Sequence, residues 1–323
     1  YKKDGYYYLF IAESGTAIHH SVSVARSLSL FGEYESCPHN PVFTHRHLGP
    51  DFPVANVGHG DLVCAPDGRW YMVLLASRRY NNHTYMGRET FLAKVTWHEG
   101  WPFVNEGLGR LEDEFTLALE ECPVEKPVTR LSGEADALPH TFLMLRNPSD
   151  FFGFTKEAVR LQLKPEVIAD RVSPAYIGLR LESHHSVVRA DLTLFSYLSH
   201  AEAGLVLLQS NDNHLRFTII RTDDEYFIQL TQCKTASQRV LKKRKVSSPV
   251  CSLEIAVDGE TAAFSYTSNG KRKVLADNVN LSFLSTEAAG GFTGITAGIY
   301  ATSNGKTNSG YADFSLFELN DAE

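Results

Sequence analysis

The sequence predicts an all-β protein, and three observations carry that prediction. The apolar runs are short, and turn signals separate them every few residues. No run sustains the 3.6-residue period of an amphipathic helix. Asp-Gly or Asn-Gly stands between several pairs of apolar runs, where a type I′ turn with two positive φ angles would close a hairpin. These dipeptides are Asp67-Gly68, Asp258-Gly259 and Asn269-Gly270.

Length and composition bound the class of protein. A chain of 323 residues suggests two domains, and 43% apolar with 21% charged residues is ordinary for globular proteins. The net charge of −7 gives no reason to expect a nucleic-acid partner. No stretch approaches the ~20 apolar residues of a membrane span, so no membrane partner is expected. The basic run at 242–245 is interpreted as a solvated hairpin tip.

The cysteines give no metal or disulfide framework. There are five, with no CxxC pair and no Cys/His ligand spacing. Cys64 follows an apolar run and is expected to be a buried small hydrophobe. The scattered, odd count favours reduced thiols and a cytoplasmic protein over a secreted one, and the location is otherwise left open. The five are Cys37, Cys64, Cys122, Cys233 and Cys251.

Residues 1–105 are predicted to form the first domain. Residues 6–12 are rich in aromatic and β-branched side chains and predict a strand. Residues 21–27 predict a second strand. Residues 61–97 predict a hairpin, a longer loop and a further strand. Each group resembles a β-meander, and meanders repeated around an axis make a propeller.

The amino-acid composition changes after residue 105. Residues 106–138 are acidic and interrupted by prolines, which favours a linker on the surface. Residues 139–323 then contain about ten runs that alternate apolar and polar residues. Such a series without helices is typical of a two-sheet sandwich.

Two polar side chains stand beside glycines in the most distinctive part of the first domain. His59 lies between Gly58 and Gly60, and Arg88 follows Gly87. Glycine allows the backbone to pass close to a ligand or to another strand. His59 and Arg88 are therefore candidates for the floor of a binding site.

The order of motifs in this region resembles the last blades of glycoside hydrolase family 43, and especially its two-domain β-xylosidase and α-L-arabinofuranosidase branch. Residues 7–16 match the same branch, except that Ser14 replaces its usual second glycine. The resemblance implies about two blades of a five-bladed propeller and then a concanavalin-like sandwich. The motifs are Gly58-His59-Gly60-Asp61, Asp67-Gly68-Arg69-Trp70-Tyr71, Gly87-Arg88-Glu89-Thr90, Gly100-Trp101-Pro102 and, in the sandwich, Gly290-Gly291-Phe292-Thr293-Gly294.

The resemblance also implies a chemistry. The family hydrolyses glycosides with inversion, which requires an acid and a base carboxyl group on either side of the scissile bond. By the resemblance, the base Asp, the modulating Asp and the acid Glu all lie before Tyr1. No catalytic residue is therefore assigned, and Glu13, Asp61 and Glu89 are not promoted to fill these roles.

The chain is accordingly interpreted as the C-terminal portion, a fragment, of a glycosidase. The complete enzyme would remove terminal pentoses from xylan- or arabinan-derived oligosaccharides, and the 323 residues alone are expected to be inactive. The alternative is a non-catalytic carbohydrate-binding protein. Xylose against arabinofuranose specificity and homo-oligomer formation are left open.

Three substrate-binding residues follow from the resemblance. His59 would lie under the sugar near the propeller axis, or contact a central metal through water. Calcium is the metal that the family allows, and no cofactor is required. Arg88 would hydrogen-bond the terminal sugar, and Phe292 would lie at the pocket mouth. The competing interpretations are a buried structural histidine, an Arg88 ion pair with Glu89 or Glu13, and core packing of Phe292.

Overall fold

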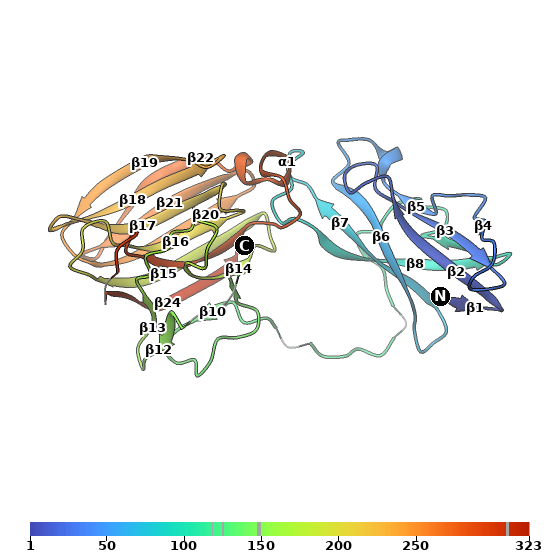
Figure 1. Ribbon diagram of the computed structural model, residues 1–323, viewed down its shortest axis with the longest axis horizontal. Helices are drawn as coiled ribbons and strands as arrows, with labels where there is room; N and C mark the ends of the chain where they lie inside the picture. The colour runs from blue at the N-terminus through green and yellow to red at the C-terminus, as the bar shows by residue number, and fades with distance from the viewer. Residues whose placement is uncertain (118, 125, 147–149, 308–309, 323) are drawn as a thin grey trace. The chain divides into compact units, whose positions relative to one another are not determined.

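The computed structural model describes residues 1–117, 119–124, 126–146, 150–307 and 310–322. It confirms the all-β class, since strands make up almost all of the regular structure (Figure 1). Among the described residues the helices are η1 (Arg46–Leu48), η2 (Ser282–Leu284) and the four-residue α1 (Thr286–Ala289), and none could cross a membrane. The chain divides into two compact units, Tyr1–Val124 and Glu125–Glu323.

The first unit contains two antiparallel sheets, each a meander as expected for blades of a propeller. One sheet has the order β1-β2-β3-β4, with β5 also on β3, and the other has the order β6-β7-β8-β9. The strands of the first are β1 (Lys2–Lys3), β2 (Tyr6–Glu13), β3 (Ser21–Ser27), β4 (Glu35–Ser36) and β5 (Phe43–Thr44). Those of the second are β6 (Val54–Cys64), β7 (Trp70–Arg78), β8 (Glu89–His98) and β9 (Trp101–Val104).

One apolar cluster joins these two sheets. Val22 of β3 packs in the same cluster as Met72 and Leu74 of β7, and all three are almost fully buried. The tryptophans pack against other aromatic rings rather than forming open platforms. The Trp97 ring lies edge-on to Tyr8 and to Trp70, with centroid distances of 5.1 and 5.7 Å.

The second unit is a sandwich of two antiparallel sheets. The first has the order β12-β13-β24-β15-β20-β21-β22 with β10 on β24, and the second has the order β11-β14-β23-β16-β17-β18-β19. The first sheet's strands are β10 (Arg130–Leu131), β12 (Phe152–Phe154), β13 (Val159–Gln162), β15 (His185–Phe195), β20 (Val250–Asp258), β21 (Thr261–Ser268), β22 (Lys271–Asn280) and β24 (Tyr311–Asp321). The second sheet's strands are β11 (Leu143–Met144), β14 (Ala175–Arg180), β16 (Glu202–Leu208), β17 (His214–Thr222), β18 (Glu225–Lys234), β19 (Ser237–Val246) and β23 (Thr296–Thr302).

The core of the sandwich lies between its sheets. Phe217 of β17 meets Phe264 of β21 edge-to-face at a centroid distance of 5.4 Å, and both rings are fully buried. The strand β10 falls within residues 106–138, the stretch expected to be a linker. Its pairing with β24 assigns the end of that stretch to the sandwich.

The type I′ turns expected at Asp-Gly and Asn-Gly dipeptides form at some of these positions and not at others. Asn269 and Gly270 both have positive φ, 51° and 71°, as a type I′ turn requires. At Asp67-Gly68 the expected hairpin forms, but only Gly68 has positive φ, so the turn is not type I′. Thr235 and Ala236 have φ of 50° and 63° without any glycine.

Two expectations about single segments are wrong. Cys64 is exposed, not buried, at the end of β6. Residues 242–245 lie within the edge strand β19, not at a hairpin tip, although their side chains are largely solvated as expected.

Candidate functional site

His59 breaks the regular alternation of β6. Its φ is 53°, and the pairing of β6 with β7 shifts register just before it, between Ala55 and Gly58, and again in the stretch that contains it, between Gly58 and Asp61. Register shifts of this kind re-aim side chains at sheet edges and near sites. The His59 side chain is exposed, which excludes the interpretation as a buried structural histidine.

The flanking glycines make room for neighbouring side chains. A Cβ on Gly58 would lie 2.5 Å from the His20 ring, and a Cβ on Gly60 would lie 2.5 Å from Sδ of Met72. Side chains at either position would therefore displace a buried neighbour. The two glycines predicted that another group passes close to the backbone here. The groups that do so are the side chains of His20 and Met72.

His20 connects the two candidates in this unit. Its side chain is 1% exposed, and its Nδ1 lies 3.1 Å from the carbonyl oxygen of Asn56. Burial lowers the pKa of His20, the hydrogen bond to Asn56 opposes this, and electrostatic interaction with Arg88 and His59 lowers the pKa further. His59 and Arg88 are thus near enough to the same imidazole to influence it, and His20 is held neutral at pH 7.

Arg88 is half-buried, and burial lowers the pKa of its guanidinium. Its Nη2 donates a hydrogen bond to the carbonyl oxygen of Thr16. The carboxylates proposed as its partners are engaged elsewhere. Glu89 accepts hydrogen bonds from Nε and Nη2 of Arg78 at 2.5 to 3.1 Å, and Glu13 accepts one from Ser23.

A hollow of about 300 Å³ lies beside His59. It is lined by Tyr1, Tyr8, Leu9, Phe10, Ala12, His59, Gly60 and Asp61, so Arg88 is not part of its wall. The Tyr1 hydroxyl donates to Oδ1 of Asp61 at 3.0 Å and accepts from the Leu62 amide at 2.9 Å. Asp61 therefore serves to hold Tyr1 at the rim of the hollow.

Phe292 lies in the second unit, on the loop that follows α1. The glycines before it, Gly290 and Gly291, have φ of 77° and 78°, a conformation that other residues rarely adopt. The Phe292 side chain is 56% exposed, so it is not a core residue. Nε2 of Gln209 donates to the Gly290 carbonyl oxygen at 2.9 Å and holds the base of this loop.

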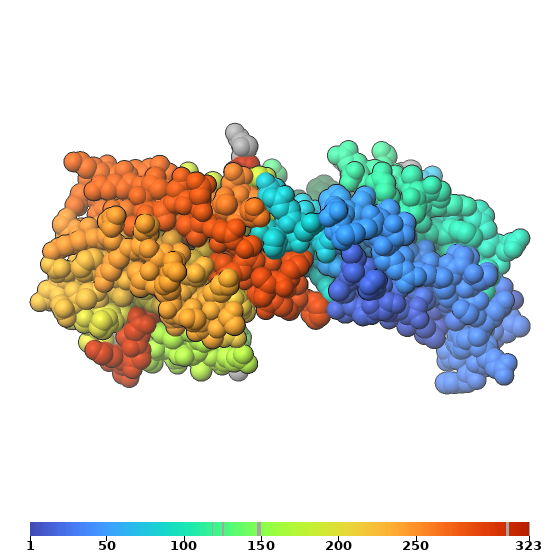
Figure 2. Space-filling model, turned by 90° about the horizontal axis from the view of Figure 1, so that it is seen from above, coloured from blue at the N-terminus to red at the C-terminus, as the bar shows by residue number. Residues whose placement is uncertain are grey.

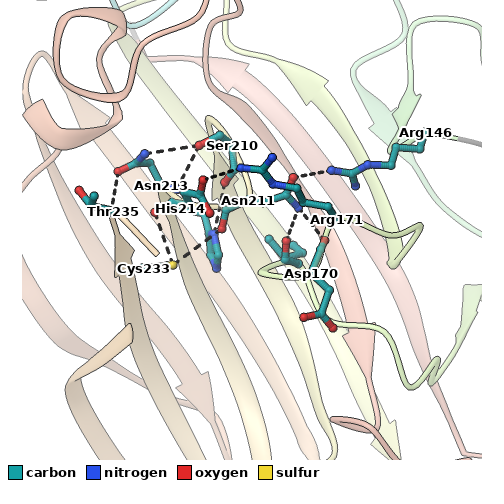
Figure 3. A network of polar contacts seen from close by, with 11 residues as sticks. Arg146, Asp170, Arg171, Ser210, Asn211, Asn213, His214, Cys233 and Thr235 are labelled. Atoms are coloured by element: carbon teal, nitrogen blue, oxygen red, sulfur yellow. Dashed lines mark hydrogen bonds and ion pairs between the residues drawn. The ribbon is translucent and has the colours of Figure 1, made fainter. Parts of the chain in front are cut away.

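Gln209 follows β16 and opens the turn that leads to β17. Figure 3 shows how Asn211 and Asn213 of this turn are held by neighbouring segments. Nδ2 of Asn211 donates to the Asp170 carbonyl oxygen at 2.8 Å, and the Thr235 amide donates to Oδ1 of Asn213 at 3.1 Å. The loop that carries Phe292 thus rests on a well-braced turn. Sequence reasoning missed Gln209, because its partner is 81 residues away and no local pattern marks the pair.

The described residues contain no group of three or more His, Cys, Asp or Glu side chains arranged to hold a metal ion. Calcium therefore stays a prediction from the resemblance. His59, Arg88 and Phe292 likewise stay predicted substrate-binding residues. Their positions are now known within each unit.

Comparison with known families gives two matches in chain order. Residues 1–102 match glycosyl hydrolases family 43, and residues 134–320 match the β-xylosidase C-terminal concanavalin A-like domain. These matched ranges fall in the first and second units respectively. The order, a blade-like domain and then a sandwich, is the one expected from the motifs.

Individual relatives agree with these matches. The xylosidase/arabinosidase of Butyrivibrio fibrisolvens is 41% identical over 99% of this chain and 63% of its own length. The non-reducing end α-L-arabinofuranosidase BoGH43B of Bacteroides ovatus is 32% identical over 99% of this chain and 61% of its own length. This chain therefore spans a little over three fifths of these relatives.

Solved structures show the same similarity. The Bacteroides ovatus xyloglucan PUL GH43B superposes with a TM-score of 0.93 at 29% identity, over 100% of this chain and 65% of that one. The xylan β-1,4-xylosidase from Bacillus halodurans C-125 gives a TM-score of 0.93 at 28% identity, over 99% and 64%. The propeller-like and sandwich architecture is thus shared with these proteins.

Proposed function

Because the chain belongs to glycoside hydrolase family 43, we propose that it forms part of an enzyme that removes terminal pentoses from xylan- or arabinan-derived oligosaccharides. The observation that carries this proposal is the succession of two family matches across both units. The names of the relatives, xylosidases and arabinofuranosidases, support the pentose as the sugar that is released. The reaction would be hydrolysis with inversion, by one acid and one base carboxyl group.

In this proposal the first unit supplies groups that hold the sugar. Arg88 donates hydrogen bonds to sugar hydroxyls, and its fixed charge favours the ionised form of nearby carboxylates. His59, exposed beside the 300 Å³ hollow, contacts the sugar from below. The buried His20 ring lies against Gly58, next to His59 in the sequence.

The proposal assigns the catalytic acid and base to no residue of this chain. Glu13, Asp61 and Glu89 each accept a hydrogen bond from another side chain of the first unit. A pair of working carboxyl groups would instead face a common space about 6.5–9.5 Å wide. We therefore expect the 323 residues alone not to hydrolyse glycosides.

A chimera tests the function. The part of the Butyrivibrio fibrisolvens relative that does not align with this chain is fused to residues 1–323. We expect hydrolysis of 4-nitrophenyl β-D-xylopyranoside or 4-nitrophenyl α-L-arabinofuranoside. Arg88→Lys should lower kcat/KM about 10- to 100-fold, because a charged hydrogen bond to the sugar is lost. Arg69→Lys, at an exposed turn in the same unit, is the matched control.

The outcomes separate the parts of the proposal. A folded chimera that is inert on both substrates, while the parent relative is active, would overturn the function. An active chimera that is indifferent to Arg88→Lys would remove Arg88 from the site. Turnover by residues 1–323 alone, abolished by Arg88→Lys, would show that the carboxyl groups lie within this chain.

A further inference from the structure

Two edge strands of the sandwich concentrate positive charge in a chain whose net charge is −7. Five of the ten residues of β19 are basic and none is acidic, and β22 opens with three basic residues. The two strands lie at the same side of the sandwich in Figure 1, and Figure 2 looks onto that side, where both are orange. The basic residues are Arg239, Lys242, Lys243, Arg244, Lys245, Lys271, Arg272 and Lys273. Such a patch attracts anions against the overall sign of the protein.

Strand register fixes which face two of these lysines occupy. Lys273 lies opposite Tyr266, and Lys271 lies opposite Ser268. Residues directly opposed in an antiparallel pair share one face of the sheet. Tyr266 is 5% exposed on the inner face, so Lys271 and Lys273 project on that face at the sheet's edge. They are two residues apart, about 7 Å along the strand.

A hollow of about 480 Å³ opens at this edge. Its lining includes Lys245, Lys271, Lys273, Ser247, Ser268 and Asn269, and we call it the basic slot. Oγ of Ser268 is buried and has no hydrogen-bond partner, while Nδ2 of Asn269 donates to Oγ of Ser247 at 2.7 Å. The slot thus combines ammonium groups with the amide side chain of Asn269, which keeps a second N–H and a carbonyl oxygen for sugar hydroxyls.

The positive charge of the slot is only partly compensated. Lys245 pairs with Glu225, and Arg272 pairs with Glu254 at 2.7 Å. Among the residues that the structure describes, no acidic side chain forms an ion pair with Lys271 or Lys273. These two lysines are therefore available to an external anion.

The basic residues of β19 and β22 have a competing explanation, which is protection of the sheet edges. Lysines on an edge strand discourage pairing with another chain, and β19 and β22 are the edges of their sheets. That role accounts for charge along exposed strands. It does not require a hollow that unites the two edges.

We propose that the basic slot binds a linear anionic polysaccharide, with Lys271 and Lys273 on its carboxylates and Asn269 on its hydroxyls. Two cations repeated along a strand fit a ligand with repeated charges better than a single ion. Tyr266, the aromatic residue in the lining, is 5% exposed and offers no face on which nucleic-acid bases could stack. A chain of sugar acids is therefore favoured over a nucleic acid.

Calorimetric titration of the 323-residue chain with hexagalacturonate at 20 and 200 mM NaCl tests this proposal. We expect binding that weakens at the higher salt concentration, because ions screen exposed charges. The double variant Lys271→Gln/Lys273→Gln should weaken binding at least about tenfold, since it removes two charge-assisted contacts. The double variant Lys271→Arg/Lys273→Arg keeps both charges and should retain binding.

The matched control is Lys156→Gln/Lys234→Gln, which removes the same charge from two exposed positions of the sandwich outside the slot lining. It should bind within about twofold of the unaltered chain. Thermal unfolding checks that each variant is folded. If the double glutamine variant does not fold, the single variants Lys271→Gln and Lys273→Gln carry the test.

Four results would overturn the proposal. These are no binding by the unaltered chain at 20 mM salt, an equal loss in the control variant, tighter binding of a single-stranded oligonucleotide with six phosphates, or equal, salt-insensitive binding of neutral xylohexaose. The titration involves no turnover. Its failure would therefore leave the proposed glycosidase function untouched.

Discussion

His214 is a single buried side chain that makes the stability of the sandwich depend on pH. It opens β17 and is 0% exposed, and its Nδ1 lies 3.3 Å from the Ser210 carbonyl oxygen (Figure 3). Burial, aided by the positive charge of Arg216, lowers the pKa of His214 to about 4. The folded protein therefore holds this imidazole neutral throughout the range in which an unfolded histidine gains its proton.

The stability of the second unit should depend on pH through His214. Its folded pKa is below the unfolded value near 6.5, so its contribution is complete above pH 6.5 and is lost as pH falls toward 4. The loss by pH 4.5 should be about 2–3 kcal/mol. Urea unfolding at pH 7.5 and 4.5 should show a smaller loss for His214→Gln than for the unaltered chain.

The control for that experiment is His140→Gln, at an exposed position of the same unit. It should follow the unaltered chain at both pH values. Equal pH dependence of the unaltered chain and His214→Gln would contradict the assignment.

Among the strands, β6 shows where sequence reasoning about burial fell short. An apolar run predicted that Cys64 is buried, but Cys64 is the last residue of β6 and is exposed there, although the pairing from Asp61 to Cys64 is regular. The competing interpretation of His59 as a buried histidine could not be decided from sequence, because it depends on register shifts that turn a side chain to the other face. Where pairing is regular, as at Asn269-Gly270, local chemistry predicted the turn correctly. At Thr235-Ala236 the pairing of β18 with β19 imposes a turn that these residues would not favour alone.

Gly58→Ala should destabilise the first unit by about 1–3 kcal/mol, because the new methyl group would overlap the buried His20 ring. Urea unfolding of the full chain measures the change. The matched control is Gly153→Ala in β12, where an added Cβ meets nothing within 4 Å. A Gly58→Ala variant as stable as the control would show that His20 can move aside.

The architecture of the whole chain was predictable where sequence patterns are local or resemble a family. Meanders, the sandwich and the order of the two units came from runs, turns and motifs. The brace from Gln209 to Gly290 and the slot between β19 and β22 could not be predicted, because each depends on strands far apart in sequence that only the folded sheets bring together.

Residues 126–323 should fold without the first unit, because they contain both sheets of the sandwich and the core between them. Expressed alone, they should give a β-type circular dichroism spectrum and one cooperative urea transition. The binding of hexagalacturonate should also be retained. A spectrum typical of an unfolded chain would show that the sandwich depends on residues 1–125.

The position of β24 has a consequence for biosynthesis. This strand, the latest in sequence, lies in the interior of its sheet and pairs with both β13 and β15. While a ribosome is still making residues 311–321, the edges of β13 and β15 that later pair with β24 have no hydrogen-bonding partner. Closure of the domain must therefore await the emergence of β24 from the exit tunnel, and until then those edges are the natural targets of a chaperone.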